Sequence, residues 1–372
     1  MTAIRSVPFF NYKALFVEHE AEYMATLRDC LMRGAFIMQR DLLDFETEFA
    51  KYLGVKHALG FADGTNALIV ALKLARIGAG DEVIVPSHTF VATASAVHQT
   101  GATPVLCDCG PDKLIDVASA RRVVTKKTKA IMPVQLNGRV ADMDAIQLMA
   151  DEFGLKIVED SCQAFGAKYR GRFGGTFGVA GSFSFYPSKT LGAFGDAGAI
   201  TMDDDDHAQE AREYRDHGRN AATGKVHRFG HNTRLDNIQA AILLLKLKRY
   251  DAAIARRRAI ARLYQQRLGS MQQLLLPPGP DSDNLRFDIF QNYEIEAERR
   301  DDLRAHLAAK GVGTILQWGG FMLHQFEDLG LRFDAPYAEA MSKRYMMLPM
   351  NDLLSEEDAH YVCDAIDSFY RQ

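Results

Sequence analysis

The sequence has little of what marks secreted, membrane-spanning or nucleic-acid-binding proteins. Its 372 residues include one tryptophan and only five scattered cysteines, an odd number that does not make a disulfide framework. The longest apolar runs, such as residues 240–245, are far too short to cross a bilayer. The net charge of −4 shows no excess of basic residues. We therefore expect neither nucleic acid nor a membrane as a partner, although a polyanionic substrate remains compatible with local charge.

The cysteines and the N-terminus carry few functional signals. Residues 1–10 lack the apolar core and the small-residue cleavage site of a signal peptide, which predicts a cytoplasmic protein. The run Cys107-Asp108-Cys109 could suggest a metal site, but no second cysteine or histidine pair lies at zinc spacing. We therefore predict no metal, and we interpret the cysteines as reduced and mostly buried thiols.

Residues 55–205 alternate short β-branched runs with helical stretches. Such alternation predicts right-handed crossovers and an α/β fold, in which helices cover both faces of a mainly parallel sheet. Ligands of these sheets bind at the carboxyl ends of the strands. The predicted strands are 83–85, 104–106, 130–132 and 156–158, and the predicted helices are Asn66–Arg76, Val91–Gln99 and Met143–Phe153.

A different pattern begins near residue 235 and predicts a smaller α+β domain. We expect a large domain over residues 1–245, whose N-terminal segment can pack on the small domain, and a small C-terminal domain over residues 246–372. The Pro-Gly stretch 277–280 predicts a break in regular secondary structure within this second part. Its predicted helices are Ile238–Tyr250, Ala252–Gln266, Arg300–Lys310 and one that starts at Ser355, and its predicted strands are Gln291–Ile295 and Gly313–Gln317.

The densest chemical signal surrounds Lys189. An aromatic strand from Ser182 runs into the turn Pro187-Ser188-Lys189, and glycine-rich sequence follows. A lysine in a loop is by default a solvated surface residue. Here apolar sequence precedes the lysine and glycines follow it, so that a flat ligand could approach the backbone. A partly buried lysine loses its proton more easily and can form a Schiff base with an aldehyde.

Three other segments follow predicted strands and offer candidate site residues. Asp160 either caps a helix or pairs with a protonated pyridine nitrogen, in which case Gln163 could contact the ring oxygen of that cofactor. The Gly64-Thr65 turn opens a helix and offers backbone N–H groups to a phosphate. Phe90 is either a core aromatic or a ring that stacks on the pyridine. His88 is either a loop hydrogen-bonder or a group near the substrate.

Taken in order, these stretches resemble the DegT-like family of nucleotide-sugar aminotransferases. The resemblance extends over nearly the whole chain, and this ordered agreement is more specific than any one motif. The matching segments are Gly34–Ile37, Gly64-Thr65 with Ala67-Leu68, Pro86–Phe90, Glu159-Asp160 with Gln163-Ala164, Phe183–Phe185 with Pro187 and Lys189, and Asn232–Asp236 with Gln239–Ala241.

The resemblance implies an aspartate-aminotransferase-like fold with a seven-stranded type of sheet. It implies pyridoxal phosphate as the cofactor, passing through its pyridoxamine phosphate form, and a homodimer that builds each active site from both subunits. Lys189 would be the lysine that bonds to the cofactor and moves the proton, and Asp160 would hold the ring nitrogen. The other implied contacts are Gln163 to the ring oxygen, Phe90 on the ring face, Gly64, Thr65 and Ser184 to the phosphate, and Asn232 to the same phosphate from the neighbouring subunit.

The expected reaction moves an amino group from glutamate to a nucleotide-linked keto sugar in a ping-pong course. The run Lys189–Gly192 with Gly195-Asp196 resembles members that act on 3-keto sugars, so we expect a 3-keto-6-deoxy or related 3-keto hexose. A 4-keto-6-deoxy sugar and a keto-cyclitol stay as alternatives. Dehydration of a sugar and a non-catalytic cofactor-binding regulator are more distant ones, because the chain keeps Lys189 and Asp160.

One departure from the family pattern bears on the substrate. Gln317-Trp318 stands where many members have a His-Tyr pair, and Trp318 is the only tryptophan. It either fills the core of the small domain or lines the sugar pocket, since an aromatic face suits the apolar side of a hexose. We take His88, Tyr186, Gln317 and Trp318 as candidate substrate contacts.

Overall fold

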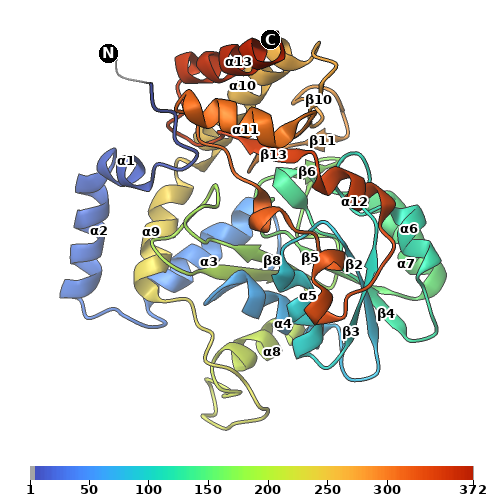
Figure 1. Cartoon of the computed structure of the whole chain (residues 1–372). Coiled ribbons are helices and arrows are strands. Elements are labelled where there is room, and N and C mark those ends of the chain that lie inside the picture. Colours follow the sequence, from blue (N-terminus) through green and yellow to red (C-terminus); the bar gives the residue numbers. More distant parts are fainter. Residues whose placement is uncertain (1–4, 372) are drawn as a thin grey trace.

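The computed structural model describes residues 5–371 and is built around a seven-stranded sheet (Figure 1). Its strand order is β1-β9-β8-β5-β4-β2-β3. All neighbours from β8 to β3 are parallel, which confirms the predicted α/β class, whereas β9 runs antiparallel to both β8 and β1. The strands are β1 (His57–Phe61), β2 (Glu82–Pro86), β3 (Thr103–Cys107), β4 (Thr128–Ile131), β5 (Lys156–Asp160), β8 (Ala180–Ser184) and β9 (Gly198–Met202).

Helices cover both faces of this sheet because successive strand residues point to opposite sides. In β2, Ile84 joins one apolar cluster while Val83 and Val85 join the other. The first face is covered by α3 (Arg40–Leu53), α6 (Val117–Arg122), α7 (Met143–Phe153) and α9 (Asn237–Leu247). The second face is covered by α4 (Gly64–Leu74), α5 (Val91–Gln99) and α8 (Asp205–Arg215). Helices α5 and α7 begin and end where the sequence predicts.

The C-terminal part forms a second apolar core around a small antiparallel sheet of order β10-β12-β13. The N-terminal segment joins it, because Val7 forms a parallel bridge with Val312. The division of the chain at residue 245 stays a prediction. The elements are β10 (Leu274–Leu275), β12 (Tyr293–Ala297), β13 (Tyr345–Leu348), α10 (Tyr250–Leu268), α11 (Arg300–Ala309), α12 (Pro336–Ser342) and α13 (Glu356–Tyr370).

The remaining elements lie at the edges of these two cores. Helix α2 packs against α9, and both it and α1 lie on the left of Figure 1. A third sheet of order β11-β6-β7 is made of two-residue strands. Within residues 5–371, no helix has both the length and the apolar character needed to cross a membrane. The elements are α1 (Tyr12–Val17), α2 (Glu20–Met32), β6 (Lys168–Tyr169), β7 (Arg172–Phe173), β11 (Arg286–Phe287), and the short 3-10 turns η1 (Leu136–Gly138), η2 (Gln317–Gly320), η3 (Leu323–Gln325) and η4 (Glu327–Leu329).

The predicted strand Gly313–Gln317 is wrong. Only Ile315 forms a bridge, to Met347, before the chain turns into η2. The N-terminal segment explains part of the difference, because Gly313 donates its N–H to the carbonyl of Val7 and so bonds away from the small sheet. The left-handed backbone of Trp318, with φ 53°, then ends any extended run.

Candidate active site

A cavity of about 540 Å³ opens where the predicted site segments meet. It lies beside the carboxyl ends of β1, β2, β5 and β8, which is where ligands of such sheets bind. Nine of the predicted residues line it, and they come from five segments of the sequence. They are Gly64, Thr65, Phe90, Asp160, Gln163, Ser184, Tyr186, Lys189 and Trp318.

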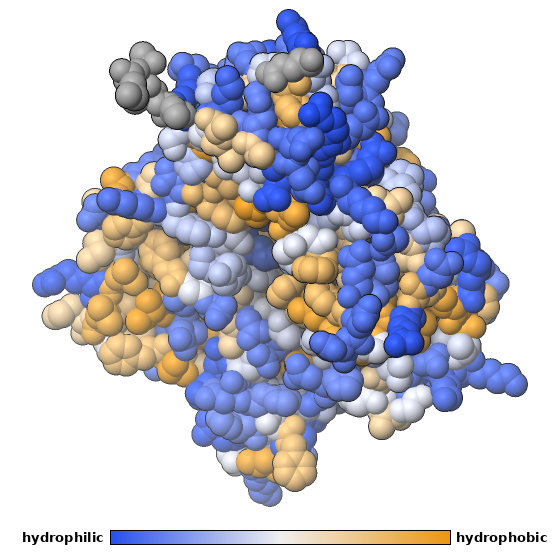
Figure 2. Space-filling view, viewed as in Figure 1, coloured by the Kyte–Doolittle hydropathy of each residue, from blue (hydrophilic) through white to orange (hydrophobic). Residues whose placement is uncertain are grey.

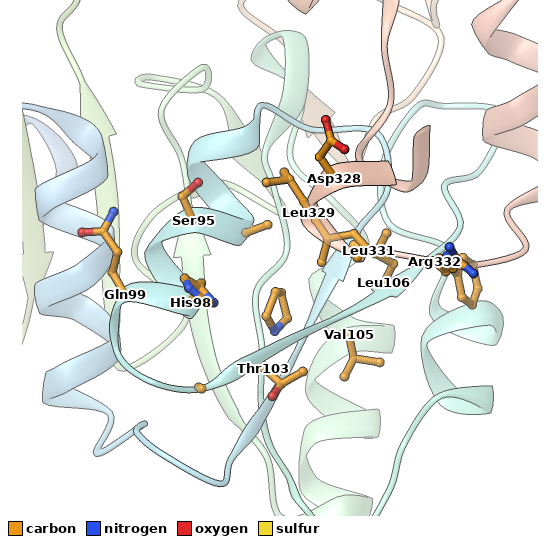
Figure 3. A pocket seen from close by; sticks show the side chains of 15 residues that line it. Ser95, His98, Gln99, Thr103, Val105, Leu106, Asp328, Leu329, Leu331 and Arg332 are labelled. Atoms are coloured by element: carbon orange, nitrogen blue, oxygen red, sulfur yellow. The ribbon is translucent and has the colours of Figure 1, made fainter. Parts of the chain in front are cut away.

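A second cavity, of about 630 Å³, lies against the other end of α5 (Figure 3). Strand β3 and residues 328–333 form its remaining walls. Its charged or titratable side chains are His98, Asp328 and Arg332, and no lysine lines it. The larger cavity thus lacks an amine nucleophile, so we assign the chemistry to the smaller one.

Lys189 is held at the wall of the 540 Å³ cavity by a tight turn. Its N–H donates to the carbonyl of Tyr186 at 2.8 Å. The Gln291 carboxamide fixes the same turn, because it accepts from the N–H of Thr190 at 2.7 Å and donates to the carbonyl of Ser188 at 2.9 Å. Burial lowers the pKa of the Lys189 ammonium, although Cys162 and Asp160 oppose that shift. A lowered pKa makes the neutral, nucleophilic amine easier to reach.

Asp160 ends β5 inside the cavity with its carboxylate oriented from two sides. The Thr93 hydroxyl donates to Oδ2 at 2.8 Å, and the N–H of Cys162 donates to Oδ1 at 3.2 Å. The element that follows Asp160 is the strand β6, and no helix begins between residues 161 and 167, so the interpretation as a helix cap is wrong. Neither donor is a cation, so the negative charge stays available for a cationic ligand group.

The opposite end of the cavity is suited to an anion. Asp63 caps α4 by accepting from the N–H of Asn66 at 2.8 Å. The N–H groups of Gly64 and Thr65 lie in the first turn, where a helix offers them no internal acceptor. The Thr65 and Ser184 side chains border the same space. A helix N-terminus with free N–H groups and two hydroxyls is a phosphate-binding arrangement.

Gly64 is needed because α4 approaches β8 and the turn after β5 very closely. A Cβ atom at residue 64 would lie 2.7 Å from Cys162 Sγ and 3.0 Å from Ser184 Cβ. We expect Gly64→Ala to cost about 1–3 kcal/mol of folding free energy and to weaken cofactor retention by displacing Ser184. Thermal denaturation and equilibrium dialysis with pyridoxal phosphate measure the two effects. The matched control is Gly78→Ala, whose new Cβ has its nearest neighbour at 3.8 Å; equal losses in both variants would contradict the argument.

The aromatic residues of the cavity wall agree in part with the prediction from the sequence. Phe90 is half-exposed on the cavity, and its ring centroid lies 6.3 Å from that of Trp318. Trp318 packs against the apolar cluster on one face of the large sheet, so the interpretation that it fills the core of the small domain is wrong, and its contact with the sugar stays a prediction. Gln163 lines the cavity while its Oε1 accepts from the N–H of Asn137 at 2.9 Å.

Three predicted site residues do not line the cavity of this chain. His88 and Gln317 are buried directly behind the cavity. Their side chains form hydrogen bonds with the Glu294 carboxylate instead of facing the cavity. Asn232 is exposed and forms a bridge with Asp216 on a segment that leaves the body of the chain. Its predicted contact lies in a neighbouring subunit, so its role stays a prediction.

Several residues of the site were missed from the sequence. Thr93 follows Thr89 by one helical turn, and their hydroxyls lie 2.8 Å apart, so helical spacing was a usable signal. Gln291 and Asn137 come from segments distant in sequence, and nothing local marks them. Glu294 lies in an alternating Tyr-Glu-Ile-Glu strand, where a carboxylate is expected to face water.

A lysine, a strand-end carboxylate and an anion-binding helix end around one cavity define an enzyme of the aspartate-aminotransferase-like, pyridoxal-phosphate-dependent class. The comparisons with known proteins specify the family. The chain belongs to the DegT/DnrJ/EryC1/StrS aminotransferase family, which it matches over residues 17–367, and is a pyridoxal-phosphate-dependent sugar aminotransferase.

Similar proteins cover almost the full length of the chain. The dTDP-3-amino-3,4,6-trideoxy-alpha-D-glucose transaminase of Streptomyces venezuelae is 38% identical over 97% of this chain and 95% of its own. A pleiotropic regulatory protein of Geobacillus stearothermophilus is also 38% identical, over 98% of this chain and 99% of its own. The crystal structure of S. venezuelae DesV in complex with an intermediate superposes with a TM-score of 0.94 at 37% identity, covering 99% of each chain.

Proposed function

We propose that this nucleotide-sugar aminotransferase moves an amino group from glutamate to carbon 3 of a keto hexose carried on a nucleotide. The observation that carries the aminotransferase chemistry is that Lys189 and Asp160 face one cavity whose far end is the N-terminus of α4. The choice of carbon 3 is supported by the sequence after Lys189 and by the similarity to a transaminase that forms a 3-amino sugar.

The residues present fit pyridoxal phosphate by the chemistry of their donors. Gly64, Thr65 and Ser184 would hold the phosphate, Asp160 the ring nitrogen and Gln163 the ring oxygen. Phe90 would cover one face of the ring. When bound, the cofactor supplies an aldehyde that accepts an amine and a ring that takes up negative charge.

The side chains of the chain perform the remaining steps. Lys189 Nζ, whose pKa burial lowers, would act as the amine nucleophile, and the same atom would take the proton from the amine-bearing carbon of the substrate and pass it to the former aldehyde carbon of the cofactor. Asp160 would keep a proton on the ring nitrogen of the bound cofactor, and the Thr93 hydroxyl fixes the direction of the Asp160 carboxylate. Gln291 keeps the lysine turn in place during both half-reactions.

A homodimer with shared active sites is part of the proposal. Lys189 is the only basic side chain that lines the cavity, beside the carboxylates of Asp63, Asp160 and Asp196, so a diphosphate needs further cations. The segment from His217 to Arg234 holds one lysine, three arginines and three histidines and no acidic residue. It leaves the body of the chain below α8 and carries Asn232 (Figure 1).

Exposed apolar side chains give the same proposal a contact surface. They gather over the N-terminal helices on the left of Figure 2. Phe229, within the basic segment, is almost fully exposed. Sedimentation at the mass of a single chain would contradict the dimer. The exposed residues in and after α2 are Met24, Leu31, Met32, Phe36, Ile37 and Met38.

The alternative functions differ from the proposed one either in the molecule that accepts the amino group or in lacking a catalysed reaction. A 4-keto-6-deoxy sugar would use the same cavity, and a keto-cyclitol would need no nucleotide. A regulatory role without turnover is suggested by the name of the Geobacillus relative. Against it, the chain keeps the amine and the carboxylate that transamination requires.

A panel of acceptors tests the proposal. Protein loaded with pyridoxal phosphate is expected to be yellow, to lose its visible band with glutamate, and to regain it with a nucleotide-linked 3-keto hexose. Parallel samples receive the matching 4-keto sugar, a keto-inositol, and the 3-keto hexose without its nucleotide. Recovery of colour with the 4-keto sugar alone would move the reaction to carbon 4. A colourless protein after cofactor addition would overturn the assignment as a whole.

A further inference from the structure

A carboxylate buried behind the cavity collects donors from three separate segments. The side chain of Glu294, in β12, is only 1% exposed, and its Oε1 lies 3.1 Å from Nε2 of His88, whose side chain is fully buried. Asn137 Nδ2 donates to Oε2 at 3.1 Å, and Gln317 Nε2 donates to the same atom at 2.8 Å. A buried carboxylate costs free energy unless it is paired and hydrogen-bonded, and these partners meet that need.

The ring of His88 and the charge of Glu294 fit each other. His88 Nδ1 lies 2.9 Å from Met322 Sδ while Nε2 faces Glu294, so both ring nitrogens lie against acceptor atoms. Burial opposes ionisation of Glu294. The charge and hydrogen bond of His88, with Lys113 and Asn137, outweigh burial, so the pKa of that carboxyl falls below its usual value.

The donors lead directly to the cavity wall. Gln317 precedes Trp318, which has φ 53° and begins a left-handed run through Gly319 and Gly320. A left-handed conformation costs a non-glycine residue about 1–2 kcal/mol, and it persists where the surroundings hold it. Gln317 Oε1 also accepts from Nε2 of Gln163 at 3.3 Å, and Gln163 lines the cavity.

Other contacts hold the same corner. The Tyr345 hydroxyl donates to the carbonyl of Gln317 at 2.7 Å. The indole of Trp318 packs edge-on against the His88 ring, with centroids 5.3 Å apart. The direct neighbours of Glu294 therefore contact both Trp318 and Gln163, although Glu294 itself does not line the cavity.

We propose that Glu294 is a positioning residue of the sugar pocket, which holds Trp318 and Gln163 at the cavity wall through Gln317, His88 and Asn137. The substrate it serves rests on the proposed function. The placement of Trp318 does not, because it can be measured without turnover.

The same strand offers a matched control. Glu296 lies two residues further along β12, on the same side of the strand, and is also buried. It pairs with Lys113 and accepts from the Tyr337 hydroxyl at 2.9 Å, so it too joins β12 to a basic residue of the other domain. None of these three residues lines the cavity.

The experiment compares wild type, Glu294→Gln and Glu296→Gln as full-length protein. Trp318 is the only tryptophan, so fluorescence that is excited selectively at tryptophan, where tyrosine hardly absorbs, reports on Trp318 alone. The emission wavelength and the quenching by acrylamide are measured, and not the emission intensity, because the neighbouring imidazole of His88 changes the intensity by itself. Glu294→Gln is expected to shift emission to the red and roughly double the quenching constant without cofactor. In loaded enzyme it should raise the KM for the accepted keto sugar about tenfold, with kcat less affected.

The control separates positioning from stability. Glu296→Gln is expected to lower Tm because it leaves Lys113 unpaired, yet to keep the fluorescence and KM of wild type. Unchanged fluorescence and KM in Glu294→Gln, or equal shifts in both variants, would overturn the proposal. If Glu294→Gln does not fold, His88→Gln must shift emission in the same direction. If no keto sugar is aminated by wild type, the proposed function fails while the fluorescence result still decides the role of Glu294.

Discussion

Replacement of Lys189 by alanine is expected to reduce turnover by about four orders of magnitude or more. The variant removes both the amine that bonds to the cofactor aldehyde and the base that moves the substrate proton. It leaves Gly64, Thr65, Ser184 and Asp160 in place, so pyridoxal phosphate should still bind, held only by non-covalent contacts. The measurements are single-turnover kinetics with glutamate and the visible spectrum of the loaded protein.

Lys246 provides the matched control. Burial lowers its pKa to about 8, so Lys246 also loses its proton more easily than a free lysine does. It does not line the cavity; its Nζ donates instead to the carbonyl of Gly192 at 2.6 Å. Lys246→Met is expected to keep the visible band and most of the activity. Borohydride reduction followed by peptide mapping should place the cofactor on residue 189, and a label on residue 246 would refute the assignment.

The sequence predicts the parts of the site that follow strands. Asp160, Phe90, the Gly64-Thr65 turn and the turn of Lys189 each directly follow a strand whose pattern is visible locally. Because parallel strands place their carboxyl ends at one edge, the order of these segments was enough to bring them together. The residues that orient them were not predictable in this way.

Long-range partners explain what the sequence could not predict. Gln291 fixes the Lys189 turn across a separation of about a hundred residues, and no local pattern marks it. Glu294 and Glu296 alternate with apolar residues as solvent-facing groups would, yet both are buried because the other domain covers that face of β12. For the same reason His88 and Gln317 lie buried against Glu294, and not in the cavity that the sequence predicts them to line.

The antiparallel pairing of β9 could not be predicted from the local sequence pattern either. The local sequence of β9 resembles that of the neighbouring strands, but β9 lies between β1 and β8 and runs in the opposite direction to both. Its placement brings Gly198 against the start of α4, where a Cβ atom would lie 2.4 Å from the carbonyl carbon of Asp63. The phosphate-binding end of the cavity thus depends on a strand direction that only tertiary packing decides.

Asp160→Asn is expected to lower kcat by about three orders of magnitude while the protein keeps its fold and its covalently bound cofactor. The amide has the shape of the carboxylate: its oxygen can still accept from the N–H of Cys162, and its NH2 group can donate to the Thr93 hydroxyl oxygen, at the positions set by the distances of 3.2 and 2.8 Å. It cannot balance a positive ring nitrogen. The ring then loses its proton and takes up negative charge poorly, so proton transfer at the substrate carbon slows.

A second variant separates charge from orientation. Thr93→Val keeps the charge of Asp160 and removes the hydroxyl that directs Oδ2, so we expect a loss of only about tenfold in kcat. Asp160→Glu keeps the charge with a longer side chain and should fall between the two. Isotope effects from deuterium at the α-carbon of glutamate test the reason, because a slower proton transfer must raise them in Asp160→Asn. If Asp160→Asn retained a tenth of wild-type kcat with an unchanged isotope effect, the carboxylate would not be the partner of the ring nitrogen, and its place at the end of β5 would serve the fold alone.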